Sequence, residues 1–199
     1  MANESRVRQA GVACAVGGAL WTIALLPAVP FHDAIYGSTT AYRAWEGLLV
    51  VVDVLLLVGV AGLAGSGAAG AGALGRIGLG IALLGRTSFL VGEILSFARG
   101  RDDAMFVPLG ALVTAVGMTV AGIAVVRARR WDGWNRVLPL LTGVYPFVAM
   151  FPVLAITHHK SDLIIALWGI VWLLLGIALQ ARRSPAGAAQ RAAKAAAYS

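Results

Sequence analysis

Hydrophobic residues occur along this chain in six long blocks, separated by short polar or glycine-rich segments. Each block is about as long as the roughly 20 mainly apolar residues that cross a bilayer as a helix. The fold class expected is therefore all-α, a polytopic membrane bundle of six transmembrane helices. The predicted spans are residues 9–29, 44–64, 74–97, 105–127, 137–157 and 162–181.

The chain is expected to contain one membrane domain and a short tail. Residues 1–183 hold all six blocks, and residues 184–199 are rich in alanine and basic residues. We expect this tail to be disordered or to form a surface helix. The first block follows Arg6 and Arg8, as in a signal peptide, but it is longer than the usual core of about 7–15 residues, so a retained span is expected.

Prolines and small residues predict how the blocks end and pack. Pro27 and Pro30 are expected to end the first helix, which leaves residues 31–43 as a loop that could fold over the adjacent mouth of the bundle. Glycine and serine in residues 65–75 predict a tight turn, and three prolines predict a kinked fifth helix. One stripe of the first helix carries small residues that favour close helix approach, namely Gly11, Ala15, Gly18 and Thr22.

Composition supports this class. The chain is 59% hydrophobic and 13% charged, with a mean hydropathy of +0.83. Soluble domains carry about 25% charged residues, so little of this chain is left for a soluble domain. The small-residue stripes are also compatible with a homo-oligomer.

The basic residues are distributed unevenly between the two sides of the predicted bundle. Eleven lie on the side of both termini, namely Arg6, Arg8, Arg76, Arg127, Arg129, Arg130, Arg136, Arg182, Arg183, Arg191 and Lys194. The other side has four, namely Arg43, Arg99, Arg101 and Lys160. Basic residues mark the cytoplasmic side, so we expect a multi-pass protein of the cell membrane with both termini cytoplasmic. The net charge of +7 is then a topology signal that favours anionic lipids as partners and not nucleic acid.

Four ionisable residues lie inside the second and third blocks at matched positions. Glu46 and Asp53 are two helical turns apart, and so are Arg86 and Glu93. Asp53 and Arg86 lie equally far along the chain from the centre of the predicted turn, and so do Glu46 and Glu93. In an antiparallel hairpin, Asp53 therefore lies level with Arg86, and Glu46 lies level with Glu93. Charges at membrane depth usually face a protein interior or a wet cavity, so these residues mark the candidate site.

Each pair of residues that face each other across the hairpin has two interpretations. Asp53 and Arg86 could form a buried ion pair that fixes helix register, or Arg86 could bind an anionic ligand such as a diphosphate or carboxylate, oriented by Asp53. Glu46 and Glu93 could meet, in which case one carboxyl would stay neutral and could serve as a general acid. Alternatively, Glu46 caps the second helix near Arg43 and Glu93 pairs with Arg99.

Other chemistry has little support in the sequence. The phosphate-binding, dinucleotide-binding and nucleophile-elbow motifs are missing, and we expect no cofactor. A single cysteine, Cys14, excludes an internal disulfide, and we interpret it as a packing residue. His158, His159 and Asp162 lack the spacing of a metal motif, so we interpret them as an interfacial loop and expect no metal site.

Aromatic residues could line the wall of a cavity and stabilise a cation. The candidates are Trp45, Phe89, Tyr145, Phe147, Trp168 and Trp172. Together with the intramembrane carboxyls, this architecture resembles small membrane-embedded terpene cyclases. The resemblance implies an isomerase- or lyase-type enzyme in which Glu93, Asp53 or Glu46 protonates an apolar isoprenoid and starts a carbocation cascade.

Two other interpretations stay open. Midplane charges and a proline-broken helix also suit a small-solute or proton-coupled transporter, or a non-catalytic accessory protein. The segment RARRW, residues 127–131, followed by a proline-bearing helix, is also similar to six-span membrane proteins of high-GC bacteria. That similarity implies a fold but no function.

Overall fold

The computed structural model of the chain describes residues 2–101, 105–157 and 161–181. Every regular element in these ranges is helical, and six segments are long and apolar enough to cross a membrane, which confirms an all-α bundle of six spans. The α-helices are α1 (Ala2–Tyr36), α2 (Thr39–Gly65), α3 (Ala73–Arg99), α4 (Phe106–Ala128), α5 (Leu138–Tyr145), α6 (Phe151–Thr157) and α7 (Asp162–Gln180). Two shorter elements, η1 (Gly133–Val137) and η2 (Pro146–Met150), complete the fifth span together with α5 and α6.

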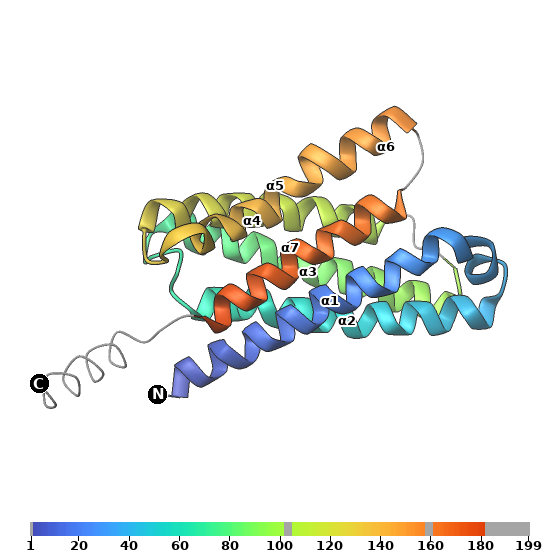
Figure 1. Ribbon diagram of the computed structural model, residues 1–199, viewed down its shortest axis with the longest axis horizontal. Helices are drawn as coiled ribbons and strands as arrows, with labels where there is room; N and C mark the ends of the chain where they lie inside the picture. The colour runs from blue at the N-terminus through green and yellow to red at the C-terminus, as the bar shows by residue number, and fades with distance from the viewer. Residues whose placement is uncertain (1, 102–104, 158–160, 182–199) are drawn as a thin grey trace, which may run out of the picture.

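The spans form a ring in which chain neighbours are also neighbours in space. Helix α1 packs against α2 and α7, α3 packs against α2 and α4, and α5 packs against α4 and α7. Successive spans run antiparallel along an elongated bundle, so α1 begins at the end where α7 finishes (Figure 1). We call this the terminal end and the opposite end the far end. The predicted tail, residues 184–199, lies outside the described residues.

The connection between the first two spans differs from the predicted loop over residues 31–43. Helix α1 continues to Tyr36, with a non-helical residue at Phe31 (φ −109°, ψ 17°), and α2 begins at Thr39. Ser38 caps α2 because its Oγ accepts a hydrogen bond from the backbone N–H of Ala41 at 3.4 Å. The prediction was wrong in extent because the chain is kinked at Phe31 and then resumes a helix as far as Tyr36.

The turn between α2 and α3 agrees with the prediction. It contains Gly67 and Gly70 at φ of 67° and 73°, the left-handed region in which glycine avoids a steric penalty. This turn makes α2 and α3 the antiparallel hairpin that the paired charges required.

The fifth span is bent, as its prolines predicted. Between α5 and α6 the chain forms a π-helical turn, η2, that begins at Pro146. In Figure 1, α6 diverges from the other helices at the far end. Its side chains are correspondingly open, with Leu154 44% exposed and Ile156 79% exposed.

Close helix contacts depend on small residues, as the stripe on the first helix predicted. A Cβ built on Gly18 would lie 2.6 Å from the backbone oxygen of Gly169 on α7, so a larger residue could not be accommodated there without separating the two helices. Thr22 on the same stripe donates a hydrogen bond to the carbonyl of Ala166 at 3.1 Å. These contacts hold the first and last spans together.

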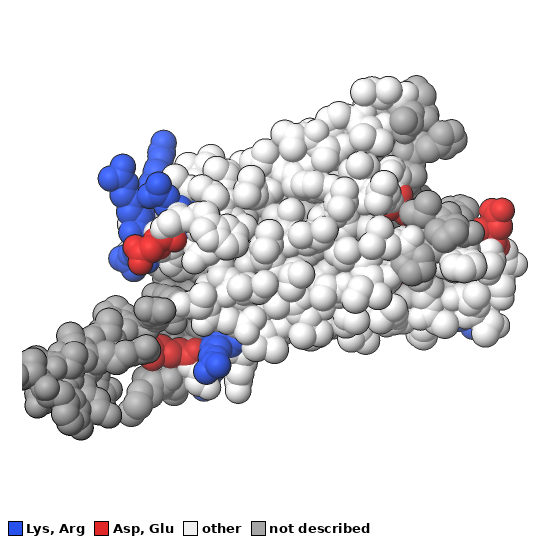
Figure 2. Space-filling model, in the orientation of Figure 1, with Lys and Arg blue, Asp and Glu red and all other residues white. Residues whose placement is uncertain are grey.

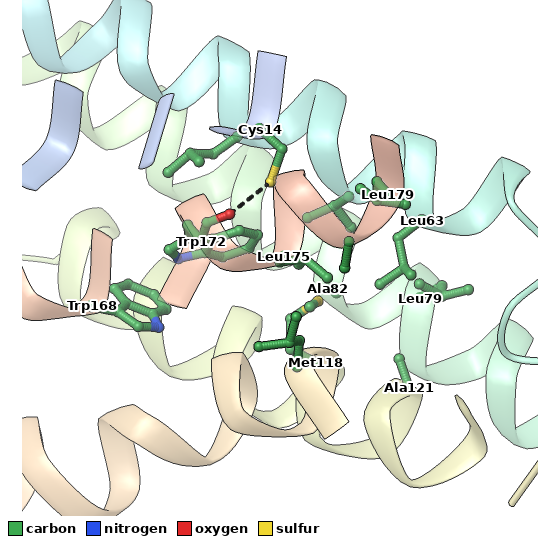
Figure 3. Packing of buried hydrophobic residues seen from close by; sticks show 14 of the residues in the cluster. Cys14, Leu63, Leu79, Ala82, Met118, Ala121, Trp168, Trp172, Leu175 and Leu179 are labelled. Carbon is green, nitrogen blue, oxygen red and sulfur yellow. Dashed lines mark hydrogen bonds between the residues drawn. The ribbon is translucent and has the colours of Figure 1, made fainter. Parts of the chain in front are cut away.

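The half of the bundle nearer the terminal end is a packed apolar core. Leu63, Met118 and Leu175 from three different helices are fully buried in it (Figure 3). Cys14 is also buried and donates a long hydrogen bond, 3.4 Å, from Sγ to the carbonyl of Trp172 (Figure 3). Large buried side chains therefore occlude the bundle on this side.

The surface has a broad uncharged belt, with charged residues gathered at both ends (Figure 2). Basic residues form a dense group at the terminal end in the same view, and the end of α4 carries Arg127 and Arg129. Arg130 also ties this end of the bundle together, since its Nη1 donates to the carbonyl of Gly67 at 3.2 Å. An apolar belt between charged rims is the surface expected of a multi-pass membrane protein.

Candidate functional site

The predicted hairpin register is confirmed by an ion pair in the middle of the bundle. Arg86 on α3 donates from Nη2 to Oδ1 of Asp53 on α2, and both side chains are fully buried. Two charges in an apolar interior are tolerated because each neutralises the other. Asp53 and Arg86 thus fix α2 against α3 at one register.

The Arg86 guanidinium is also enclosed by aromatic rings from three helices. Its Cζ lies 4.8 Å from the ring centroid of Phe89 and 5.4 Å from those of Trp21 and Trp172. Aromatic faces attract a cation, and the attraction is strong where water is excluded. Arg86 therefore has counter-groups on α1, α2, α3 and α7 at once and acts as the central link of the bundle.

Polar atoms around this pair are only partly satisfied by the described residues. Arg86 Nε and Nη1, Asp53 Oδ2 and Trp172 Nε1 are buried without a hydrogen-bond partner among them. The cation–π contacts compensate part of this deficit for the guanidinium.

The second pair, two glutamates, meets nearer the far end of the bundle than Asp53 and Arg86. A hydrogen bond joins the carboxyls of Glu46 on α2 and Glu93 on α3, which are 5% and 4% exposed. An ionised carboxylate can only accept, so a hydrogen bond between two carboxyls requires a proton on one of them. The alternative role of Glu46, as the cap of α2, does not match this geometry, because Ser38 provides that cap.

Glu46 and Glu93 line a cavity of about 170 Å³ in the far half of the bundle. Its walls come from α1, α2, α3, α4, η2, α6 and α7. Aromatic and aliphatic side chains make up most of the lining, including Trp45, Phe89 and Trp168. The arrangement is an apolar pocket with a few convergent carboxyls, which is the usual composition of a small-molecule site.

Hydrogen bonds fix the aromatic wall. Trp21 donates from Nε1 to the carbonyl of Ile165 at 2.8 Å, and Trp168 donates from Nε1 to the carbonyl of Thr142 at 2.9 Å. The rings of Trp21 and Trp168 meet edge-on at 5.9 Å between centroids. Satisfied indole N–H groups leave the faces and edges of these rings available for apolar contacts.

The predicted site residues fall into three groups by their position relative to the cavity: those that line it, those buried beside it, and two aromatic residues of the fifth span. Five line the cavity, namely Glu46, Glu93, Trp45, Phe89 and Trp168. Asp53, Arg86 and Trp172 lie in the fully buried layer beside them and do not line it.

The other two predicted aromatic residues, Tyr145 and Phe147, do not line the cavity either. Tyr145 donates its hydroxyl to the carbonyl of Ile164 at 2.8 Å, which ties α5 to α7. Phe147 is 39% exposed and contacts Phe151, with ring centroids 5.6 Å apart. The π-helical turn at η2 changes the direction in which side chains of this span point, which straight helical spacing could not anticipate.

Sequence reasoning missed several cavity residues. Trp21, Tyr36, Met150 and Phe151 line the cavity, and so does Asp162, which was assigned to an interfacial loop. Trp21 could have been found, since it is the only tryptophan of the first block and lies in its apolar part. Tyr36 follows the kink at Phe31, and Met150 and Phe151 lie at the end of the π-helical turn, so straight helical spacing does not place them.

A metal-binding cluster of three or more His, Cys, Asp or Glu residues is not found in the described ranges. His158, His159 and Lys160 lie outside those ranges. The chemistry that the described site offers is therefore that of carboxyls in an aromatic, apolar cavity.

Comparison of the chain with protein-family models, with curated proteins and with solved structures gives no match. Inference about function therefore starts from the geometry of the cavity.

Proposed function

We propose that the protein is an integral membrane enzyme that protonates an apolar, isoprenoid-type substrate, in the manner of a terpene cyclase or isomerase. The observation that carries the proposal is the hydrogen-bonded carboxyl pair, Glu46 and Glu93, on the wall of an aromatic cavity. Asp53 does not line the cavity, so we assign the acid to this pair and the supporting role to Asp53 and Arg86.

The chemistry needs only groups that the site contains. The protonated carboxyl transfers its proton to an alkene carbon, which forms a C–H bond and leaves a carbocation beside a carboxylate. Loss of a proton from a neighbouring carbon to that carboxylate restores the acid and gives an isomer of unchanged mass. Trp45 and Trp168, which line the cavity and are not among the rings around Arg86, offer π-faces that stabilise the cation between these steps.

The size of the cavity suggests which part of a substrate would enter it. An engineered cavity of about 150 Å³ binds benzene, so 170 Å³ suits a group of similar size. One end of an isoprenoid, about one isoprene unit or slightly more, would occupy the cavity. The rest of the chain would extend past α6 toward the hydrocarbon of the bilayer.

We further propose that the protein is in the cell membrane with both termini cytoplasmic, because of its basic terminal end. The cavity would then face the outer leaflet. A reporter fused after Ser199 should be cytoplasmic, and a cysteine introduced within residues 31–43 should react with an impermeant maleimide from outside. The same side for both would refute this orientation.

The test of the enzyme is turnover in membranes. Wild-type protein in proteoliposomes would be incubated with isoprenoid alkenes and epoxides, and products of unchanged mass would be sought by mass spectrometry and NMR. Glu93→Gln keeps the shape but removes the acid, so product formation should fall by about 10²–10⁴-fold. Glu4→Gln changes an exposed carboxyl at the start of α1 and serves as the matched control.

Full turnover in both Glu93→Gln and Glu46→Gln would refute the carboxyl mechanism. If no isoprenoid reacts with the wild type, the transporter or accessory interpretation takes its place. The feature that favours a proton-coupled transporter is the sequence of ionisable groups from the cavity to the bundle centre, Glu93, Glu46, Asp53 and Arg86.

A further inference from the structure

The cavity is acidic in a basic protein. The chain has 16 basic and 9 acidic residues. Among the described residues that line the cavity, three are acidic and none is basic; the three are Glu46, Glu93 and Asp162. Arg86, the nearest buried cation, lies outside the lining and is already paired with Asp53.

The two glutamates of the cavity face no basic residue among its described lining. One carboxylate oxygen, Oε2 of Glu46, is buried without a hydrogen-bond partner among the described residues. The hydrogen bond between Glu46 and Glu93 requires one proton on the pair. A buried acceptor without a donor is costly, and a cationic ligand would relieve that cost.

The remaining walls have the chemistry of an organic-cation site. Six aromatic residues line the cavity, namely Trp21, Tyr36, Trp45, Phe89, Phe151 and Trp168. Aromatic cages bind quaternary ammonium groups through their π-faces, and an alkylammonium head pairs well with a carboxylate. A metal ion would instead require oxygen ligands that converge, and the described residues contain no such cluster.

From these observations, the geometry points to a second ligand class for this cavity: a monovalent lipophilic cation with a small head, which displaces the proton shared by Glu46 and Glu93. This inference needs only ground-state binding and does not depend on the isoprenoid reaction.

Binding of the cation and loss of the proton are linked. In the free protein the pair retains its proton, and the bound cation replaces that proton as counter-charge. The other titratable or charged groups near the pair are Tyr36 on α1, Asp53 on α2, Arg86 on α3 and Asp162 on α7, whereas the described lining of α4 and α6 is apolar. Cation affinity should therefore rise with pH, about tenfold per unit over the range in which the pair is protonated.

The probe is benzyltrimethylammonium, titrated calorimetrically into the full-length protein in detergent micelles, with protein-free micelles as the blank. Its neutral isostere, neopentylbenzene, has the same shape without the charge. We expect the cation to bind at least tenfold more tightly than the isostere at pH 8, and to release up to one proton, measured with a pH indicator in weak buffer.

Variants assign the effect to the pair. Glu93→Gln and Glu46→Gln should each lower cation affinity at least tenfold and abolish proton release, whereas Glu93→Asp should retain part of both. Glu4→Gln should match the wild type. Equal affinity for the cation and its isostere, or affinity independent of pH, would overturn the inference even if the Gln variants failed to fold.

The outcomes separate this inference from the proposed function. Cation binding without isoprenoid turnover would support the cation site alone and refute the enzyme. Turnover without selective cation binding would support the enzyme and refute the cation site. If both occur, benzyltrimethylammonium should inhibit turnover competitively, because both ligands need the same cavity.

Discussion

Removing one member of the Asp53–Arg86 pair should destabilise the bundle more than removing both. Asp53→Leu leaves a fully buried guanidinium without its acidic partner. Breaking a buried pair in this way costs about 3–5 kcal/mol. For a chain of this size each kcal/mol lowers Tm by roughly 2–4 °C, so Tm should fall by about 6–20 °C.

The opposite single substitution should cost less. Arg86→Met leaves the Asp53 carboxyl buried, but a carboxyl can take up a proton and become neutral, whereas a guanidinium stays charged. The double variant, Asp53→Leu with Arg86→Met, replaces the pair by apolar side chains. Such replacement is often neutral or stabilising, although here the contacts of Arg86 with three rings are also lost.

The assay is thermal unfolding of purified protein in detergent, followed by the loss of the monodisperse peak in size-exclusion chromatography. Arg43→Ala is the control, since Arg43 is exposed and its Nη2 donates to the carbonyl of Ala98 at 3.3 Å, outside the buried layer of Asp53 and Arg86. Its effect should stay within about 0.5 kcal/mol. If Asp53→Leu is as stable as the wild type, the pair does not hold the bundle together. The same conclusion follows if the double variant is no more stable than Asp53→Leu alone.

Three further outcomes follow from the packing. Gly18→Leu should prevent folding by separating α1 from α7, whereas Gly80→Leu, where a Cβ meets nothing within 4 Å, should be tolerated; this is read from the yield of monodisperse protein. Cys14 should resist maleimide in the folded protein and react fully in hot SDS, since it is completely buried; partial labelling in the folded state would contradict its placement. Tyr145→Phe should cost about 0.5–1.5 kcal/mol in the same thermal assay, because it leaves the carbonyl of Ile164 without the hydroxyl; an unchanged Tm would mean that this bond does not contribute.

The sequence was most informative where one helix hairpin determines the geometry. Asp53 and Arg86 could be paired in advance because both positions depend only on helical rise and on the centre of the turn at residues 65–75. The same register argument predicted that Glu46 and Glu93 could meet, as one of two alternatives. The structure favours the meeting, since a hydrogen bond joins the two carboxyls and neither reaches the surface.

The rest of the site depends on contacts between distant segments. Trp21 reaches the cavity because α1 packs against both α2 and α7, and the hydropathy pattern does not specify that ring of helices. Phe147 was assigned to the wall and Phe151 was not, because an expected α-helix contains a π-helical turn between α5 and α6. A pattern with a period of 3.6 residues does not show such a turn.

The π-helical turn also has a consequence for ligand length. Most walls of the cavity belong to helices that are continuous through the bundle, but the wall formed by α6 is joined to α5 only through η2 and packs mainly against it. A rigid cavity would discriminate sharply between homologous chains of different length. Because the wall formed by α6 is held mainly by η2, we expect it to pivot as longer ligands enter. Affinity should then grow steadily as methylene groups are added, by up to about 0.8 kcal/mol for each one buried, and the protein should accept a series of homologues in place of a single chain length.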